Sequence, residues 1–129
     1  MQEDVDLVRG MYDAFSRGDA EAALKFFDPD VVIDASHRVD GRVGQGREQL
    51  GSILGEWLGT WEDWREEIEE VHGTDGGVLV VSTQRGRGKG SGIEWEGRFA
   101  MLYEIRGGKI TRWTIYDDVE EGFKAAELD

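Results

Sequence analysis

The sequence lacks or is short of several residue types, and each shortage excludes a class of protein. It contains no cysteine, which excludes disulfide bonds and thiolate metal sites and leaves the redox compartment unread. Its two histidines, His37 and His72, are too few for a histidine-rich metal site. No apolar run approaches the ~20 residues that a membrane span needs. We therefore expect no metal, no cofactor and no membrane partner.

Positive charge is also scarce, because 15 lysines and arginines face 28 aspartates and glutamates, for a formal net charge of −13. A field of this sign repels nucleic acid and anionic lipid, so we expect neither as a partner. The first residues are acidic and do not resemble a signal peptide, which makes the cytoplasm the default location. The length of 129 residues indicates one domain, 1–129.

Helical spacing of apolar residues dominates the first half of the chain. It predicts helices over 3–17, 20–27 and 47–61, with a loop over 38–46 and a short closing helix over 118–128. The stripe in 47–61 is the most regular in the chain. The first half is therefore expected to be mainly helical.

Strands are expected over 31–36 and through most of the chain from Gly77 onward, with long strands over 93–106 and 109–117. Residues 62–72 fit two structures. Trp64, Ile68 and their neighbours recur as on a helix, but Trp64, Glu66, Ile68 and Glu70 also alternate as on a strand. Periodicity alone favours the helix for this segment.

The turn between the last two strands decides which side chains face inward. A two-residue loop would pair Ile105 with Ile110 and mix apolar with polar side chains. A three-residue loop, with Gly108 as a left-handed bulge, would pair Ile105 with Lys109 and create one apolar face. Because burying several large side chains together outweighs a turn preference, we adopt the second register. It predicts a ligand-binding wall of Phe99, Met101, Tyr103, Trp113 and Ile115.

Asp117 follows this wall along the last strand. In the adopted register it faces inward, roughly opposite Gly97, where partial desolvation would suit it to act as a general base. In the alternative, the strand has already ended and Asp117 caps the final helix together with Asp118. The other face of the sheet suits either a homodimer interface or a solvated surface, since charges there surround Ala100, Leu102 and Tyr116.

Several short motifs occur in a fixed order along the chain: Met11–Phe15 before Gly18-Asp19, then Phe27–Val32, Gly46–Glu48, and Gly108–Ile110 before Trp113. Together they resemble the SnoaL-like group of the nuclear transport factor 2-like superfamily, over essentially the whole chain. The resemblance implies an α+β fold, in which three N-terminal helices wrap a cone-shaped, curved antiparallel sheet around a hydrophobic pocket (a cystatin-like α+β barrel). It also implies a homodimer, and it makes 62–72 a strand.

This superfamily includes ketosteroid isomerases, polyketide cyclases, limonene epoxide hydrolases and non-enzymes, so membership does not name a function. The isomerases use a tyrosine and two acids at positions that match Met11, Ala35 and Met101 here. Tyr12 and Asp34 each lie one residue away from those positions. The isomerase machinery is therefore not reproduced at the matching residues.

The epoxide hydrolase pattern also fails. Arg85-Gly86-Arg87 offers the arginine of that pattern without its aspartate, and Ile115 occupies the place of the acid two residues after Trp113. The cyclase resemblance needs an acid near the end of the last strand. Asp117 meets that requirement, so the cyclase resemblance is the one that the residues leave intact.

Asp34 and His37 are two further candidates for proton transfer. Asp34 joins Asp117 if its side chain faces inward, and is merely solvated if Ile33 and Ala35 face inward instead. His37 would shuttle protons at the pocket mouth, or is part of the surface.

Other side chains are candidates for ligand binding. Tyr12 would offer a hydroxyl inside the cone, although a tyrosine there also suits core packing. Arg85 would anchor a carboxylate or an enolate in the pocket, whereas salt bridges to surface acids are the expected role of Arg87 and Lys89. Tryptophans suit both stacking on a flat ligand and packing in the core, and this applies to Trp57, Trp61, Trp95 and Trp113.

Two functions follow from these observations. One is a cofactor-independent, cyclase- or isomerase-type enzyme that acts by acid–base chemistry on a small hydrophobic carbonyl compound, with Asp117 moving the proton. The other is a non-catalytic ligand-binding or dimeric interaction domain of the same fold. Convergence of Asp34, His37, Arg85 and Asp117 on one cavity would favour the enzyme.

Overall fold

The computed structural model describes residues 2–38 and 41–128, so residues 39–40 of the expected 38–46 loop lie outside the described residues. Within the described chain, no helix is both long and apolar enough to cross a membrane. The elements follow one another as α1 (Gln2–Ser16), α2 (Ala20–Leu24), β1 (Phe27–His37), β2 (Val43–Gln45), α3 (Gly46–Gly59), β3 (Trp61–Thr74), β4 (Gly77–Gly88), β5 (Glu94–Arg106), β6 (Lys109–Tyr116) and α4 (Val119–Ala125).

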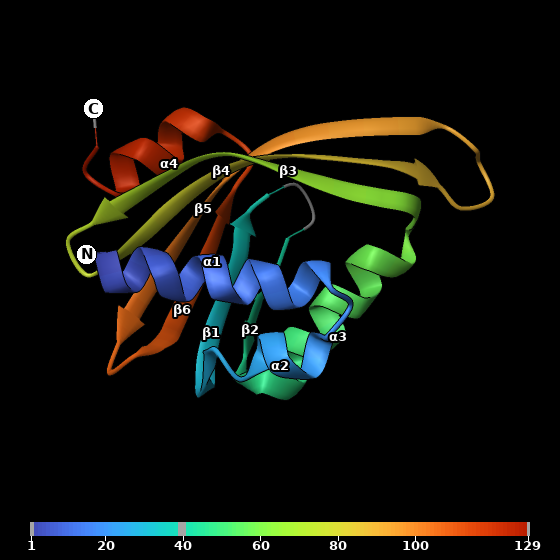
Figure 1. Ribbon diagram of the computed structural model, residues 1–129. Helices are drawn as coiled ribbons and strands as arrows, with labels where there is room; N and C mark the ends of the chain where they lie inside the picture. Colours follow the sequence, from blue (N-terminus) through green and yellow to red (C-terminus); the bar gives the residue numbers. More distant parts are fainter. Residues whose placement is uncertain (1, 39–40, 129) are drawn as a thin grey trace.

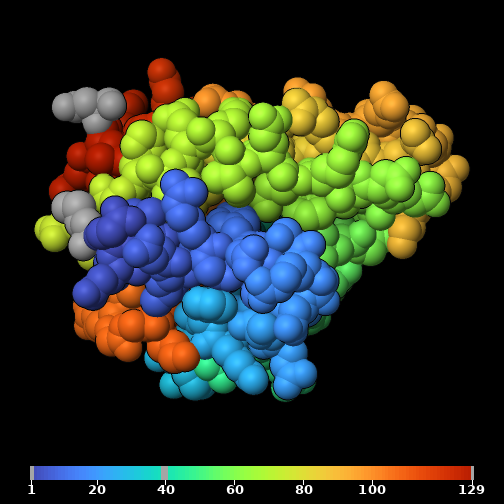
Figure 2. Space-filling model, in the orientation of Figure 1, coloured from blue at the N-terminus to red at the C-terminus, as the bar shows by residue number. Residues whose placement is uncertain are grey.

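The six strands form one curved sheet in the order β2-β1-β6-β5-β4-β3. Neighbours are antiparallel except β1 and β6, which run parallel. The sheet is not closed, because β2 and β3 form its two edges. The helices α1, α2 and α3 lie on its concave side (Figure 1), and α1 and α2 form one face of the molecule with β3 running beside them (Figure 2). The expected α+β fold with three N-terminal helices is confirmed.

The segment that fitted both a helix and a strand is the edge strand β3, as the family resemblance implied. It pairs with β4 along its whole length, from Trp61 opposite Gly88 to Thr74 opposite Gly77. Two irregularities interrupt the pairing, and the first includes Asp63, whose φ is 53°. Hydrogen bonding to β4 over this length outweighs the helical periodicity of the segment, which reflects only local sequence.

The predicted register of the last hairpin is wrong, but the predicted inner wall is present. Gly107 and Gly108 both have positive φ, 61° and 76°, as a two-residue hairpin turn requires, and Ile105 pairs with Ile110. A bulge at Thr111, between the pairs Ile105–Ile110 and Glu104–Arg112, then shifts the pairing, so Tyr103 lies opposite Trp113. The bulge restores the apolar face that the two-residue loop would otherwise have mixed.

Two apolar clusters hold the sheet between its covering helices. The larger lies between the concave face and α1 to α3, and includes the fully buried Ile33, Leu50 and Tyr103. The smaller lies on the convex face, where α4 packs on Leu79, Ala100 and Tyr116. Part of the surface proposed for a homodimer is therefore covered by the chain's own helix. The homodimer stays a prediction.

Candidate functional site

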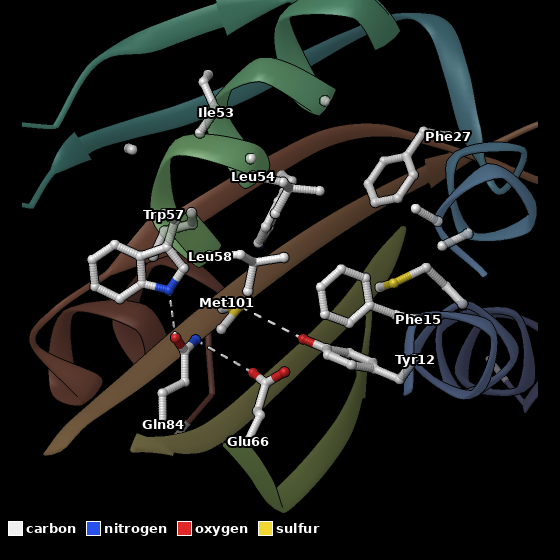
Figure 3. Close-up of a pocket in the computed structure, with 18 of the residues that line it drawn as sticks. Tyr12, Phe15, Phe27, Ile53, Leu54, Trp57, Leu58, Glu66, Gln84 and Met101 are labelled. Atoms are coloured by element: carbon white, nitrogen blue, oxygen red, sulfur yellow. Dashed lines mark hydrogen bonds between the residues drawn. The ribbon is translucent and has the colours of Figure 1, made fainter. Parts of the chain in front are cut away.

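A cavity of about 240 Å³ lies between the concave face of the sheet and the helices α1 to α3. This volume is below the ~300–1,000 Å³ typical of pockets for drug-sized ligands, so a ligand that fits inside is small. Figure 3 shows the cavity with aromatic and aliphatic side chains on most sides. Its lining from the helices includes Met11, Tyr12, Phe15, Leu54, Trp57 and Leu58, and from the central strands Phe99, Met101, Tyr103, Trp113 and Ile115.

Seven of the nine residues expected to bind ligand therefore line the cavity, namely the five of the predicted wall together with Tyr12 and Trp57. Trp61 lies behind this lining, with its ring stacked on Trp95 at 4.5 Å between centroids. Arg85 points away from the cavity and pairs with two exposed acids, Glu96 at 2.8 Å and Glu67 at 3.3 Å. The expected role of Arg85 as an anchor inside the pocket is therefore not supported, because its guanidinium group forms surface ion pairs instead.

Asp34 lies on the convex side of the sheet, because Ile33 and Ala35 are the residues of β1 that face inward. His37 lies on the same side as Asp34, since the pairing of β1 with β6 is irregular between these two residues and the simple alternation does not continue. The Ser36 hydroxyl and amide both donate hydrogen bonds to Asp34, and Arg112 Nη2 donates to it at 2.7 Å. The Ser36 hydroxyl is the main reason that the pKa of Asp34 is lowered, and Arg112 adds to the effect. His37 stacks on Tyr116 at 4.5 Å between centroids. These two candidates do not converge with the cavity.

Asp117 lies just beyond the end of β6 and is exposed. It does not line the cavity, and its Oδ1 accepts a hydrogen bond from Arg38 Nε at 3.0 Å. The cap of α4 is Asp118, whose side chain accepts from the Glu120 amide at 2.9 Å. Asp117 is therefore placed beside the cavity, where it holds an arginine that does line it.

The carboxyl group that enters the cavity is Glu66, on β3, which the sequence analysis did not select. Its Oε2 accepts hydrogen bonds from Ser82 Oγ at 2.8 Å and from Gln84 Nε2 at 3.4 Å. Both bonds end on the same oxygen, so within the described chain Oε1 has no hydrogen-bond partner. One oxygen is fixed and the other is left for a ligand.

Gln84 is itself oriented by two tryptophans. The indole nitrogens of Trp57 and Trp64 donate to Gln84 Oε1 at 2.9 and 3.2 Å. Because the amide oxygen is engaged in this way, the amide nitrogen is turned toward Glu66, as Figure 3 shows. The position of the carboxyl group is thus set by a chain of hydrogen bonds that begins on α3.

Burial raises the pKa of Glu66 from its usual 4.5 to about 7, while the hydrogen bonds from Ser82 and Gln84 act in the opposite direction. Removal from water disfavours the charged form of a carboxyl group, and here this effect exceeds the stabilisation by its two donors. Near neutral pH, Glu66 is therefore present both with and without its proton.

A pair of tyrosine hydroxyls lies near this acid. The oxygens of Tyr12 and Tyr103 are 2.6 Å apart, and each hydroxyl is 3.6 Å from Met101 Sδ. Burial is the main cause that raises the pKa of both tyrosines well above their usual 10.0. Both hydroxyls therefore keep their protons. The carboxyl of Glu66 and the hydroxyl of Tyr12 point into the same part of the cavity (Figure 3).

Glu66 and Tyr12 also line a second, more open hollow between α1 and β3, together with Arg9, Asp13 and Ile68. The acid therefore stands between the apolar cavity and a hollow at the surface. The sequence signal for Glu66 was its alternation with Trp64 along a strand, and this signal becomes readable only once β3 is known to be a strand. Gln84 had no comparable signal.

A curved six-stranded sheet, with helices on its concave side and a pocket between them, defines the nuclear transport factor 2-like class of folds. An NTF2-like protein of unknown function from Burkholderia pseudomallei has this fold, with a TM-score of 0.80 and 19% identity over 98% of both chains. A putative polyketide cyclase from Xanthomonas campestris is similar, with a TM-score of 0.73 and 27% identity over 93% of both chains.

The family model of the SnoaL-like domain matches residues 8–113, and the chain belongs to this family. The resemblance seen in the sequence motifs is thereby confirmed. An uncharacterized protein of Mycobacterium tuberculosis is 34% identical over 115 residues, which cover 84% of each chain.

Proposed function

We propose that this protein is a cofactor-independent enzyme that moves a proton on a small, largely apolar carbonyl compound held in the cavity. The observation that supports the proposal is the carboxyl group of Glu66 in a largely apolar cavity, with a pKa of about 7. A group whose pKa lies near the working pH is suited both to take a proton and to return it. Glu66 therefore replaces Asp117 as the candidate base.

The proposed step uses Oε1 of Glu66 and the hydroxyl of Tyr12. The carboxylate removes a proton from the carbon beside the carbonyl group, the C–H electron pair forms a C=C bond, and the carbonyl electrons move onto oxygen. The Tyr12 hydroxyl donates a hydrogen bond to that oxygen while the Tyr103 hydroxyl supports it. In a ligand with a second C=C conjugated to the enolate, return of the proton from Glu66 to the far carbon of that system shifts the double bond and gives an isomer. In a ligand with a second carbonyl group, attack by the enolate carbon on that group closes a ring, and the alkoxide that forms takes the proton from Glu66.

The second hollow gives this acid access to solvent. Glu66 lines both spaces, so a proton taken inside the apolar cavity is exchanged with water on the side of α1 and β3. Carbon-bound hydrogen of a bound ligand should therefore exchange with solvent hydrogen. This property is measurable before the natural substrate is known.

The alternative function is a non-catalytic ligand-binding domain. A cavity closed only by apolar side chains, without an acid, would have favoured it. Glu66 lies inside the cavity with one oxygen free of hydrogen bonds from the described residues, which favours the enzyme. The same experiment separates the two functions, because a binding domain holds the ligand without exchanging its hydrogen.

The test is deuterium incorporation into 2-indanone and 2-tetralone, two small flat ketones, followed by NMR in D2O. We expect the protein to accelerate exchange at the carbons beside the carbonyl group, with a rate that rises with pH around 7 because the carboxylate is the active form. Glu66→Gln should lower the protein-dependent rate about 100-fold or more. Glu67→Gln is the matched control, because Glu67 is on the same strand with its side chain 66% exposed and paired with Arg85.

Equal exchange rates for the protein and Glu66→Gln would reject Glu66 as the base. Broadening of the ketone signals by the protein, without any exchange above that of buffer, would reject the enzyme and support the binding domain.

A further inference from the structure

Arg38 brings a positive charge to the apolar cavity. It follows directly after β1 and is the one basic side chain among the described residues of the lining. Its guanidinium carbon lies 4.4 Å from the ring centroid of Trp57 and 4.9 Å from that of Phe99. Two aromatic rings of the cavity therefore lie against the cation, an arrangement that attracts a guanidinium group to a ring face.

The hydrogen bonding of Arg38 is incomplete within the described chain. A guanidinium group has five N–H donors in a planar fork. Arg38 uses Nε to donate to Asp117 Oδ1, and its side chain is 22% exposed. The bond to Asp117 fixes the plane of the group, and both terminal nitrogens donate to none of the described residues. A cation that is mostly removed from water and has unused donors is prepared for an acceptor from outside the protein.

We propose that Arg38 is a specificity-determining residue that binds a carboxylate, or an equally acidic oxygen, on the ligand. The ligand class is then a flat apolar carbonyl compound that carries an acidic group. The planar fork of arginine matches the two oxygens of a carboxylate, and the rings of Trp57 and Phe99 suit the flat part of the same molecule. The inference rests on the proposed function for the reaction, but its prediction about binding stands without it.

The other charges of the molecule oppose the binding of an acidic ligand. The net charge of −13 disfavours anions at long range, and Glu66 adds a negative charge inside the cavity when it is ionised. An acidic ligand therefore enters only if a local cation compensates for both effects. Arg38 is placed to do so, and the protonated form of Glu66 removes the second effect below pH 7.

The experiment compares 2-naphthoate with 2-naphthamide, which share a flat ring system and differ in charge. Dissociation constants are measured by titration calorimetry at pH 6 and 0.15 M salt, where long-range charge effects are screened beyond about 8 Å. We expect the protein to bind the carboxylate about tenfold or more tightly than the amide. Arg38→Gln should remove this preference while binding of the amide changes less than about twofold.

Arg85→Gln is the matched control, since it removes the same charge from a residue outside the cavity, and it should keep the preference. Arg38→Lys keeps the charge without the planar fork and should keep part of the preference. If Arg38→Gln binds neither probe, the proposal is judged on Arg38→Lys. A reduced preference of Arg38→Lys for the acid over the amide supports the proposal, and the absence of any preference in this variant overturns it.

Equal binding of acid and amide by the unchanged protein, or a preference that survives in Arg38→Gln, would overturn the proposal, and so would the failure of both probes to bind. Glu66→Gln is titrated in parallel. If it prefers the acid while no ketone exchanges its hydrogen, the proposed reaction fails and the assignment of Arg38 stands.

Discussion

Replacement of Glu66 by glutamine should stabilise the folded protein in a manner that depends on pH. The pKa of this carboxyl group rises from 4.5 to about 7 on folding, so between these values the folded state binds more protons than the unfolded state. Stability therefore falls as pH rises through this interval, and the loss is complete above pH 7. At about 1.4 kcal/mol for each pKa unit, the full loss is about 3.5 kcal/mol.

Glutamine keeps an oxygen that accepts from Ser82 but has no charge to bury. We expect Glu66→Gln to raise the free energy of unfolding at pH 8.5 by about 2.5 kcal/mol more than it does at pH 5, where part of the loss has already occurred. Urea unfolding followed by tryptophan fluorescence at the two pH values measures the difference. Glu67→Gln, on the same strand but exposed, should show little dependence on pH.

The reasoning fails if the effect of Glu66→Gln is the same at both pH values to within about 0.5 kcal/mol, because burial would then not penalise the charged carboxylate. It also fails if Glu67→Gln reproduces the effect, since the cause would then be the net charge of the chain.

Two further predictions concern residues outside the cavity. Gly122→Ala would place a Cβ 2.4 Å from the Cβ of Ala100, so α4 must move off the convex face, and thermal unfolding should show a loss of about 1–3 kcal/mol; an unchanged melting temperature would contradict this packing. Asp34→Asn should cost about 2 kcal/mol at pH 7, where Ser36 and Arg112 stabilise the carboxylate. Because the pKa of Asp34 is lowered from 3.8, the stabilisation declines as pH falls below 3.8 and is lost only once pH has passed through the lowered value, so urea unfolding at pH 3 should show a smaller cost than at pH 7.

The walls of the cavity were predictable from the sequence because many large apolar side chains follow the same alternating pattern along the strands. Phe99, Met101 and Tyr103 alternate along β5, and Trp113 and Ile115 continue the pattern on β6. An error of one pairing step in the hairpin did not change the result, because a bulge restored the shared face. Patterns of this kind reflect the burial of large apolar area, which dominates the free energy of folding.

Single polar residues were harder to place, because a strand reverses its side chains at every step. Asp34 and Ala35 are neighbours whose side chains lie on opposite faces of the sheet, and the same is true of Gln84 and Arg85. In the second pair, the sequence analysis selected Arg85 for the cavity because it is charged, and it missed Gln84. The prediction that Asp117 faces the cavity failed for a related reason, since β6 ends one residue before it. The position of a lone polar side chain depends on strand ends and bulges that local sequence does not specify.

The placement of Glu66 on an edge strand affects how substitutions at the site are tolerated. β3 pairs with one neighbour, whereas β5 and β6, which form much of the apolar wall, each pair with two. A substitution or a shift in a bulge on β3 therefore disturbs one ladder of hydrogen bonds and leaves the central strands in place. This arrangement therefore allows the polar side chain at the edge of the cavity to change while the central strands keep the same apolar walls.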